Sequence, residues 1–311
     1  MPFQRPRVIR PPSEAYSYFL PLTGGCSNNT CGFCNYYYGS KLQVRDLDEV
    51  KREIEALDLY ARTGVRLPDV PNIVYRLADQ WDGKKIFLQD ADALVYPVSK
   101  LIDVLKYIGE KLPSVERIAT YGTAQDVLRR TTAELAELKR LKLGIIYIGL
   151  ESGDDEILKM IDKGIDAEHI IEAGRKIKDA GILSSVTVIL GLGGVPLSER
   201  HALATARALT RMDPDYAGAL TLTLVEGTPM YDRWQKGDFQ PVTPFRSLEE
   251  LVLIIENSTF TNCFFSSMHA SNYFSLRGTL PQDKERLLAE LRRIISQGDP
   301  RLLKPEYFRG L

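Results

Sequence analysis

The chain is poor in cysteine and histidine and has no long apolar run. Four cysteines and three histidines occur in 311 residues, too few cysteines for a secreted scaffold held by disulfides. No uninterrupted apolar stretch approaches the roughly 20 residues needed to cross a bilayer. Arg5, Arg7 and Arg10 stand near the N-terminus with no apolar signal core after them, which argues against a signal peptide. We therefore expect a cytoplasmic protein that is not bound to a membrane.

The chain also lacks an excess of charge of either sign. Forty basic and 41 acidic residues give a net charge of −1, so composition offers no basic surplus for nucleic acid or anionic lipid. Hydrophobic residues make up 44% and charged residues 26% of the chain, as in ordinary globular enzymes. The chain has no low-complexity tract and no Gly/Ser linker that would separate an independent domain.

What the sequence does contain is a cluster of thiols. Cys26, Cys31 and Cys34 lie within nine residues, with the spacing C-x4-C-x2-C. Iron–sulfur clusters are usually held by four cysteinates. Three close thiols therefore predict a [4Fe–4S] cluster whose fourth iron stays open for another ligand.

Two other uses of the thiols remain open. One is a zinc site with His169, His201 or His269 as the fourth ligand, although structural zinc motifs usually come as paired half-sites. The other is a disulfide plus a spare thiol, which requires an oxidising compartment. The fourth cysteine, Cys263, stands in the apolar run Cys-Phe-Phe, which is typical of an inert buried residue.

Apolar β-rich runs alternate with helical patterns along most of the chain. The predicted strands are residues 16–22, 85–89, 117–121, 145–150, 184–190 and 217–225. The predicted helices are residues 98–110, 166–180, 198–211, 247–257 and 282–295, with two more starting at capping boxes at Asp46 and Thr131. Six successive βα units predict an α/β fold, an open partial (βα)6 barrel of the TIM type.

Three regions are expected. Residues 1–15 form an N-terminal arm, residues 16–235 form the barrel with an insertion at 63–84, and residues 236–311 form a C-terminal α/β extension that packs on the barrel opening. Chemistry in such barrels collects at the carboxyl ends of the strands. The cysteine loop, Asp90, Tyr121, Glu151 and Glu226 all follow predicted strands, so we expect them to converge.

At this point the residues carry a family resemblance. The cysteine spacing, with Phe33 before the last cysteine, resembles the cluster loop of the radical S-adenosylmethionine (SAM) superfamily, whose usual spacing has one residue fewer between the first two cysteines. The run Gly-Leu-Glu-Ser-Gly at 149–153, followed by Lys163 and Gly164, is similar to the ribose-contacting fourth strand of that superfamily. The same run is similar to that of oxygen-independent coproporphyrinogen oxidase and related proteins.

The resemblance implies cofactors and partners. It implies a [4Fe–4S] cluster, SAM chelated to the unique iron, and a one-electron reductant such as flavodoxin or ferredoxin. Electron transfer to SAM would give methionine and a 5′-deoxyadenosyl radical that acts on a small or medium-sized substrate. Cys263 alone cannot form a second cluster, which argues against branches that use auxiliary clusters, such as many peptide-modifying maturases. We see no appended RNA-binding or cobalamin-binding domain, which argues against fusion-type methylthiolation and cobalamin-dependent methylation, and we do not expect a nucleic-acid partner.

The resemblance also implies positions for the SAM molecule. Gln89 and Asp90 stand where a Gly-Gly-Glu-like segment usually meets the methionyl amino group. Glu151 or Ser152 matches the ribose contact, with helix capping as the alternative for Ser152. Leu190 and Gly191 end the fifth predicted strand, where the superfamily lays backbone against adenine.

The remaining candidates have an ordinary alternative. Arg175 is a candidate for the SAM carboxylate or a surface arginine, and Phe33 and Tyr36 are candidates for covering the cluster or adenine. Tyr121 either donates a hydrogen bond to SAM or substrate or packs in the core. His269 and Cys263 are catalytic candidates from the extension, where residues 269–273 are similar to poorly characterised radical SAM proteins. A non-catalytic iron–sulfur protein that carries electrons or senses redox state, and a zinc-stabilised binding module, stay open as alternatives.

Overall fold

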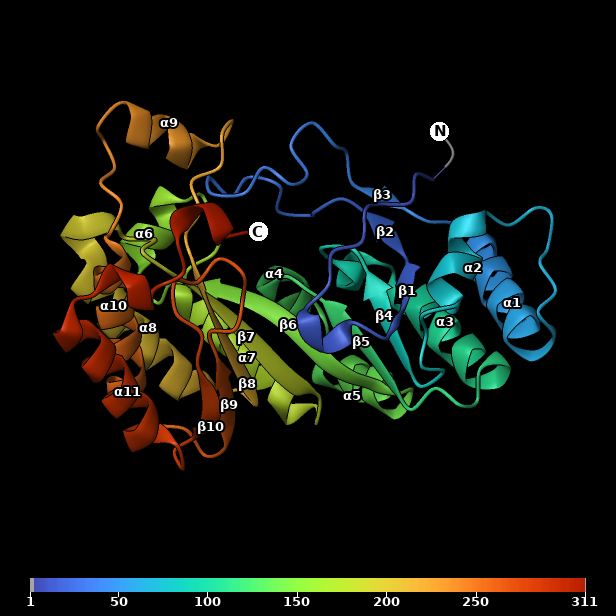
Figure 1. Ribbon diagram of the computed structural model, residues 1–311. Coiled ribbons are helices and arrows are strands. Elements are labelled where there is room, and N and C mark those ends of the chain that lie inside the picture. The colour runs from blue at the N-terminus through green and yellow to red at the C-terminus, as the bar shows by residue number, and fades with distance from the viewer. Residues whose placement is uncertain (1–2, 311) are drawn as a thin grey trace. The chain divides into compact units, whose positions relative to one another are not determined.

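The computed structural model describes residues 3–310, shown in Figure 1. The chain divides into two compact units: the first comprises the chain up to Asn29, Gly39–Tyr147 and Asp179–Ile182, and the second comprises Thr30–Tyr38, Ile148–Lys178 and the chain from Leu183 onward. Strand β6 (Leu143–Glu151) contributes residues to both units. The expected limits between arm, barrel and extension, at residues 15/16 and 235/236, stay a prediction.

The first unit is built on parallel strands. They are β1 (Tyr18–Pro21), β4 (Lys85–Gln89), β5 (Arg117–Tyr121) and the start of β6, in that order. Side chains alternate between the two faces, and Tyr18 on one face donates a hydrogen bond to Glu53 of the neighbouring helix at 2.6 Å. The helices on this side are α1 (Leu47–Thr63), α2 (Asn72–Ala78) and α3 (Val98–Lys111), which lie together beside β1 and β4 in Figure 1.

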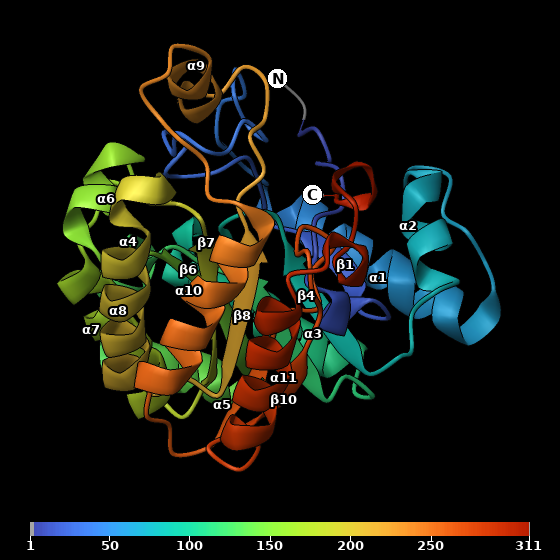
Figure 2. The same cartoon turned by 60° about the vertical axis from the view of Figure 1, so that its left-hand side comes forward.

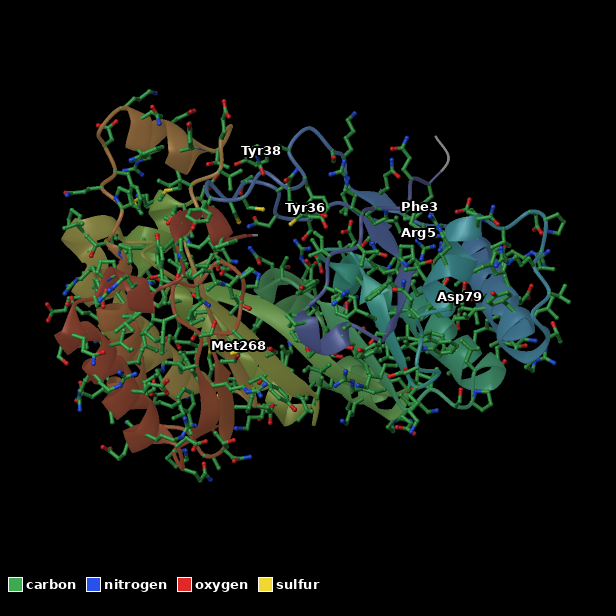
Figure 3. All side chains as sticks on the ribbon, viewed as in Figure 1. Phe3, Arg5, Tyr36, Tyr38, Asp79 and Met268 are labelled. Carbon is green, nitrogen blue, oxygen red and sulfur yellow. The ribbon has the colours of Figure 1, made fainter. Side chains whose placement is uncertain are left out.

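The opposite face of these strands carries aromatic rings and the N-terminal segment. The ring of Tyr121 lies 5.1 Å from that of Phe87 and 5.8 Å from that of Tyr147. Buried Glu14 accepts hydrogen bonds from Tyr147 at 2.8 Å and Arg117 at 2.5 Å. Earlier in the same segment, Arg5, labelled in Figure 3, is paired with buried Glu53 of α1, on the side of the strands that the helices cover. The segment expected as an arm therefore packs against the strands.

The second unit continues with strands and a layer of helices. The end of β6 is followed in the sheet by β7 (Leu183–Leu190), β8 (Tyr216–Thr221), β9 (Cys263–Ser266) and β10 (Arg277–Leu280). Strands β7, β8 and β9 are parallel to one another, and β10 is antiparallel to β9. The main helices are α7 (Ala167–Asp179), α8 (Gly194–Met212), α10 (Pro244–Asn257) and α11 (Lys284–Gln297). Helix α10 packs against both α8 and α11 (Figure 2). The C-terminal extension thus adds two strands and two helices to this unit.

Most predicted elements are confirmed, and the α/β class with a mostly parallel sheet is correct. Strands β4 and β5 have the predicted limits, and Thr131 forms the predicted capping box at α5 (Thr132–Arg140). Helix α8 starts four residues before the predicted Ser198, because Pro196 lies in its first turn, where a missing N–H does no harm. No described helix is long and apolar enough to cross a membrane.

Several short elements were not predicted. They are β2 (Thr23–Gly24), β3 (Gln43–Val44), α4 (Ala124–Arg129), α6 (Asp155–Met160), α9 (Pro229–Gln235), strands β9 and β10, and four 3-10 turns, η1 (Pro12–Glu14), η2 (Ala93–Val95), η3 (Pro300–Leu302) and η4 (Glu306–Phe308). Each is too short for a hydrophobic period to show in the sequence.

Candidate functional site

Cys31 and Cys34 lie in a loop of the second unit that is held by its backbone. Gly32 donates from its N–H to the carbonyl of Ile161 at 2.7 Å and accepts from the N–H of Met230 at 2.9 Å. The Tyr38 hydroxyl donates to the carbonyl of Cys31 at 3.1 Å. These bonds fix the loop while both thiols stay half-buried and outside any disulfide.

The aromatic residues of this loop differ in burial. Phe33 is half-buried, whereas Tyr36 and Tyr38, labelled in Figure 3, are 47% and 36% exposed. Tyr37 is buried and meets the ring of Tyr36 edge-on at 4.9 Å. One tyrosine therefore packs inward, while Phe33 and Tyr36 keep surface to offer a ligand.

Cys26 belongs to the first unit, and its two neighbours in the chain are held by aspartates that follow β4. The N–H of Gly25 donates to the carboxylate of Asp90, and the hydroxyl of Ser27 donates to that of Asp92. Asp90, predicted as a partner for an ammonium group, thus holds the backbone directly before the first cysteine. Sequence reasoning missed this anchoring role, because a loop contact leaves no periodic signal.

Asp92 also forms a buried pair with Asp126, which the sequence did not single out. Burial raises the pKa of Asp92 to about 8, and the neighbouring Asp126 carboxylate adds to the shift. The pKa of Asp126 is lowered: burial opposes this, but hydrogen bonds from Asp92, Thr123 and Arg129 outweigh it. The two carboxyl groups therefore share one proton, carried by Asp92. The only sequence signal was the helix-start pattern Thr123-x-x-Asp126, which forms a cap in the structure.

Gln89 and Tyr121 both lie in the packed part of the first unit, but Gln89 keeps one oxygen without a hydrogen bond in the described part of the chain. The amide of Gln89 donates to the carbonyls of Pro6 at 3.2 Å and Arg7 at 3.0 Å, and its buried Oε1 has no partner among the described residues. Burial raises the pKa of Tyr121, whose ring lies within the aromatic cluster described above. The geometry favours the core-packing alternative for Tyr121.

In the second unit, Glu151 ends β6 in an unusual conformation. Its φ is +62°, in the left-handed region that a non-glycine residue seldom adopts. Its Oε1 pairs with Lys163 at 2.9 Å and lies over Gly149, where a Cβ would collide with it. The motif that resembled a ribose contact thus includes its own ion pair, and backbone strain of this kind is often found at functional sites.

Ser152 is occupied within the protein. Its hydroxyl accepts from the N–H of Asp154 at 3.1 Å and donates to Nδ1 of buried His201 at 2.8 Å. His201 in turn donates from Nε2 to the carbonyl of Ile189 at 3.0 Å. Burial lowers the pKa of His201 to about 4, so the ring is neutral at neutral pH.

Gly191 is held by a buried acid on α10. The carboxylate of Glu250 accepts from the N–H of Gly191 at 2.6 Å, and its other oxygen has no partner among the described residues. Burial raises the pKa of Glu250 to about 7. Leu190 and Gly191 line a cavity of about 550 Å³ within this unit, so the predicted adenine segment does border open space.

Arg175 and Cys263 lie toward the amino ends of the strands. Arg175 donates to the carbonyl of Arg211 at 2.8 Å, near the end of α8, a helix that begins just after the carboxyl end of β7. Cys263 starts β9 next to the start of β8, since Phe264 pairs with Tyr216. Burial raises its pKa to about 12, so it stays a thiol. Both placements support the ordinary alternatives for these residues.

His269 lies in the loop that follows β9, half-buried. Ser271 accepts from the N–H of Thr221 at 3.1 Å, so its own proton is donated to Nδ1 of His269 at 2.9 Å. The histidine is therefore a neutral ring with its proton on Nε2, and burial together with Lys304 lowers its pKa. This tautomer can donate one hydrogen bond from Nε2.

The donor chemistry of the three thiols suits an iron–sulfur cluster. None of the three forms a disulfide, all are half-buried, and thiolates are the ligands that iron–sulfur clusters take. Among residues 3–310, no group of three or more His, Cys, Asp or Glu side chains gathers around a single ion site; a cubane does not need one, because each thiolate binds a separate iron. Both ring nitrogens of His201 are engaged, so it is not a ready fourth ligand for zinc.

Comparison with known proteins agrees with this site. The sequence model described as the Radical SAM superfamily matches residues 20–206. The tRNA uridine(34) acetyltransferase of Methanocaldococcus infernus is 30% identical over 113 residues, which are 35% of this chain and 21% of that protein. The uncharacterized protein YtqA of Bacillus subtilis is 25% identical over 199 residues, 62% of this chain and 59% of that protein. The chain thus covers a fifth of the first relative and less than two thirds of the second.

One solved structure shows the same fold. Coproporphyrinogen III oxidase (HemN) of Escherichia coli, a radical SAM enzyme, is 14% identical and aligns with 77% of this chain and 51% of its own, with a TM-score of 0.52. At that identity the likeness concerns the fold alone, and it agrees with the partial barrel predicted from the sequence.

Proposed function

This chain belongs to the radical SAM superfamily, and on that premise we propose that it cleaves SAM reductively at a [4Fe–4S] cluster and directs a 5′-deoxyadenosyl radical at a small or medium-sized substrate. Superfamily members are enzymes that use these two cofactors. The observation that carries the proposal is the set Cys26, Cys31 and Cys34, none of which forms a disulfide and whose neighbours Gly25 and Gly32 are held by hydrogen bonds.

The residues of this chain then have distinct tasks. The three cysteines hold the cluster, which supplies the electron that breaks the sulfonium bond of SAM. Asp90 and Asp92 keep the loop around Cys26 in place, and Phe33 and Tyr36 cover the ligand side of the loop. Gln89 remains a candidate for the methionyl end of SAM through its unpartnered Oε1. A one-electron reductant such as flavodoxin or ferredoxin would serve as the donor.

The second unit supplies the rest of the SAM and substrate contacts. Glu151, fixed by Lys163, is assigned to the ribose, and Leu190 and Gly191 to the adenine. His269 presents an Nε2 donor and is assigned to the substrate. Ser152, Arg175 and Cys263 receive structural roles, because their polar groups are already bound or lie toward the amino ends of the strands.

The test is anaerobic purification followed by visible and EPR spectra with and without SAM. We expect an iron-containing protein whose EPR spectrum changes on SAM addition and which, once reduced, releases 5′-deoxyadenosine. Replacing Cys26, Cys31 or Cys34 by alanine should abolish both the cluster and the product, a loss of at least about a thousandfold, because an iron ligand is removed.

Cys263→Ala is the matched control. This thiol is buried at the first residue of β9, so its removal should leave iron content and product release unchanged. A cluster whose EPR spectrum ignores SAM would instead support the electron-carrier or redox-sensor alternative. Stoichiometric zinc without iron would support the binding-module alternative. Either result would refute the proposed activity.

A further inference from the structure

The turn that follows α6 binds the cysteine loop of the second unit. We define this α6 turn as residues 161–163, and it belongs to the second unit together with Thr30–Tyr38. The N–H of Gly32 donates to the carbonyl of the first residue of the turn at 2.7 Å, and the hydroxyl of Thr30 donates to the carbonyl of the second residue at 2.9 Å. Thr30 and Gly32 are the two neighbours of Cys31 in the chain. The position of Cys31 therefore depends on the α6 turn.

Lys163, the last residue of the α6 turn, is ion-paired with Glu151. Its Nζ lies 2.9 Å from Oε1 of Glu151, and the two side chains are only 14% and 11% exposed. A Cβ at Gly149 would collide with the Glu151 carboxylate, so this glycine makes room for the carboxylate beside the strand. In a largely buried pair, loss of one partner leaves an uncompensated charge and destabilises far more than loss of an exposed pair. The pair therefore fixes the α6 turn to the end of β6.

Two residues around this ion pair have a strained backbone. Glu151 has a φ of +62° and Asp162 a φ of +52°, in the left-handed region that residues with a side chain seldom adopt. Such conformations persist only where surrounding contacts hold them. Asp162 is exposed, and its two neighbours supply these contacts: Ile161 is buried, and Lys163 is bound to Glu151.

The backbone of the α6 turn is also tied to α6 itself. The N–H of Ile161 donates to the carbonyl of Ile157 at 3.0 Å, and the N–H of Lys163 donates to the carbonyl of Leu158 at 2.9 Å. These bonds do not involve the lysine side chain, so they survive its removal. Loss of the ion pair should therefore loosen the turn and the loop that it holds without unfolding the unit.

We propose that Lys163 is a positioning residue for the cysteine loop: its pair with Glu151 holds the α6 turn, and the carbonyls of the turn hold the residues on both sides of Cys31. The assignment of this loop to an iron–sulfur cluster, and of Glu151 to a ribose, rests on the proposed function. On that assignment the α6 turn joins the two, so a change at Lys163 alters the retention of the cluster although its ammonium group is not an iron ligand.

The first test measures hydrogen–deuterium exchange of the Gly32 N–H in metal-free protein, by mass spectrometry of peptides that cover residues 30–38. Lys163→Met removes the charge but keeps an aliphatic chain of similar length, and Lys163→Arg restores a cation that can pair with Glu151. We expect exchange at Gly32 to be at least about tenfold faster in Lys163→Met and within about twofold of the wild type in Lys163→Arg. Neither iron nor SAM enters this measurement.

The second test measures the loss of iron from anaerobically reconstituted protein to a bipyridyl chelator. We expect Lys163→Met to lose iron at least about tenfold faster than the wild type, as loss of a contact that orients metal ligands does, and Lys163→Arg to recover most of the difference. Lys159→Met is the matched control. This lysine lies on α6 and is exposed, so its exchange and iron-loss rates should equal those of the wild type.

Three results would overturn the proposal. They are unchanged exchange at Gly32 in Lys163→Met, no recovery in Lys163→Arg, and faster exchange spread evenly over the second unit, which would mean a general role in folding. If Lys163→Met does not fold, Glu151→Gln replaces it, because it weakens the same ion pair from the other side. That variant should speed exchange at Gly32 at least about threefold, and an unchanged rate there would equally overturn the proposal.

The first test is independent of the proposed function, because exchange is measured without a cluster. A protein that passes this test but binds no iron would refute the proposed function and leave the role of Lys163 in holding the loop standing.

Discussion

The two units limit the charge on buried ionisable groups by different means. In the first unit, Asp92 and Asp126 share one proton, so a single negative charge remains, and Arg129 meets it at 2.7 Å. In the second unit, His201 and Glu250 lie 4.0 Å apart but do not form an ion pair. The pKa of His201 falls to about 4 and that of Glu250 rises to about 7, both through burial.

The two pairs also differ in the residues that they hold in place. The aspartates of the first unit hold Ser27, next to a cluster cysteine, through side-chain bonds. The second-unit groups hold backbone and motif residues: Glu250 binds the N–H of Gly191, and His201 binds Ser152. A buried polar group must be paired or neutral. In both units, therefore, polar residues near the motifs act as supports, and a motif match alone does not show which of them touch the cofactor.

The largest effect on the free energy of unfolding is expected at Gly153, where two backbone segments of the second unit lie close together. At Gly153, whose N–H donates to Thr205 at 3.0 Å, a Cβ would collide with the backbone of Ala204 and Thr205 in α8. Gly153→Ala should therefore lower the free energy of unfolding by about 3 kcal/mol, as overpacking against backbone does. Urea denaturation measures it. Gly218→Ala is the control, because its Cβ would meet no atom within 4 Å; equal losses in the two variants would contradict the packing argument.

The sequence predicted the fold better than it predicted the site. Strands β4 and β5 and the capping box at Thr131 follow from local patterns. The packing of the N-terminal segment on the first-unit strands does not, because Glu14 meets Tyr147 across 133 residues. Likewise, the cysteine motif is a local signal, whereas the pairing of Asp92 with Asp126 depends on two strand ends that only the fold brings together.

A second prediction tests whether Asp92 carries the proton of the aspartate pair in the first unit. Asp126→Asn removes the carboxylate that accepts from Thr123 and Arg129, and should cost about 2 kcal/mol of unfolding free energy. Asp92→Asn keeps a donor toward Asp126, as the protonated acid does, and should cost less than about 1 kcal/mol at pH 6. Chemical denaturation of both variants checks this. A larger loss for Asp92→Asn would mean that the proton resides on Asp126.

A third prediction tests whether Glu250 of the second unit is protonated in the folded protein. The folded-state pKa of Glu250, about 7, exceeds its ordinary value of 4.5, so the folded protein keeps a proton that the unfolded chain has lost between these pH values. The stability contribution of this group is therefore present below pH 4.5 and lost as the pH rises through 7.

The variant Glu250→Gln removes that titration. Its stability advantage over the wild type should grow by about 1–2 kcal/mol of unfolding free energy as the pH rises from 5 to 8. This is less than the full pKa shift would give. Urea denaturation at both pH values gives the difference. If the two proteins show parallel pH profiles, Glu250 is ionised in the folded state and the contrast between the units fails.

The smallest effect on SAM binding and stability is expected for a substitution at Arg175, and it decides whether this residue contacts SAM. This exposed side chain binds the carbonyl of Arg211 near the end of α8, toward the amino ends of the strands, whereas chemistry in such barrels lies at the carboxyl ends. Arg175→Ala should change SAM affinity less than about twofold and stability by at most about 0.5 kcal/mol. SAM binding by equilibrium dialysis decides it, with Glu151→Gln as the comparison expected to weaken binding. A tenfold loss in Arg175→Ala would show that the sequence resemblance located a SAM contact that the hydrogen bonds of the structure do not reveal.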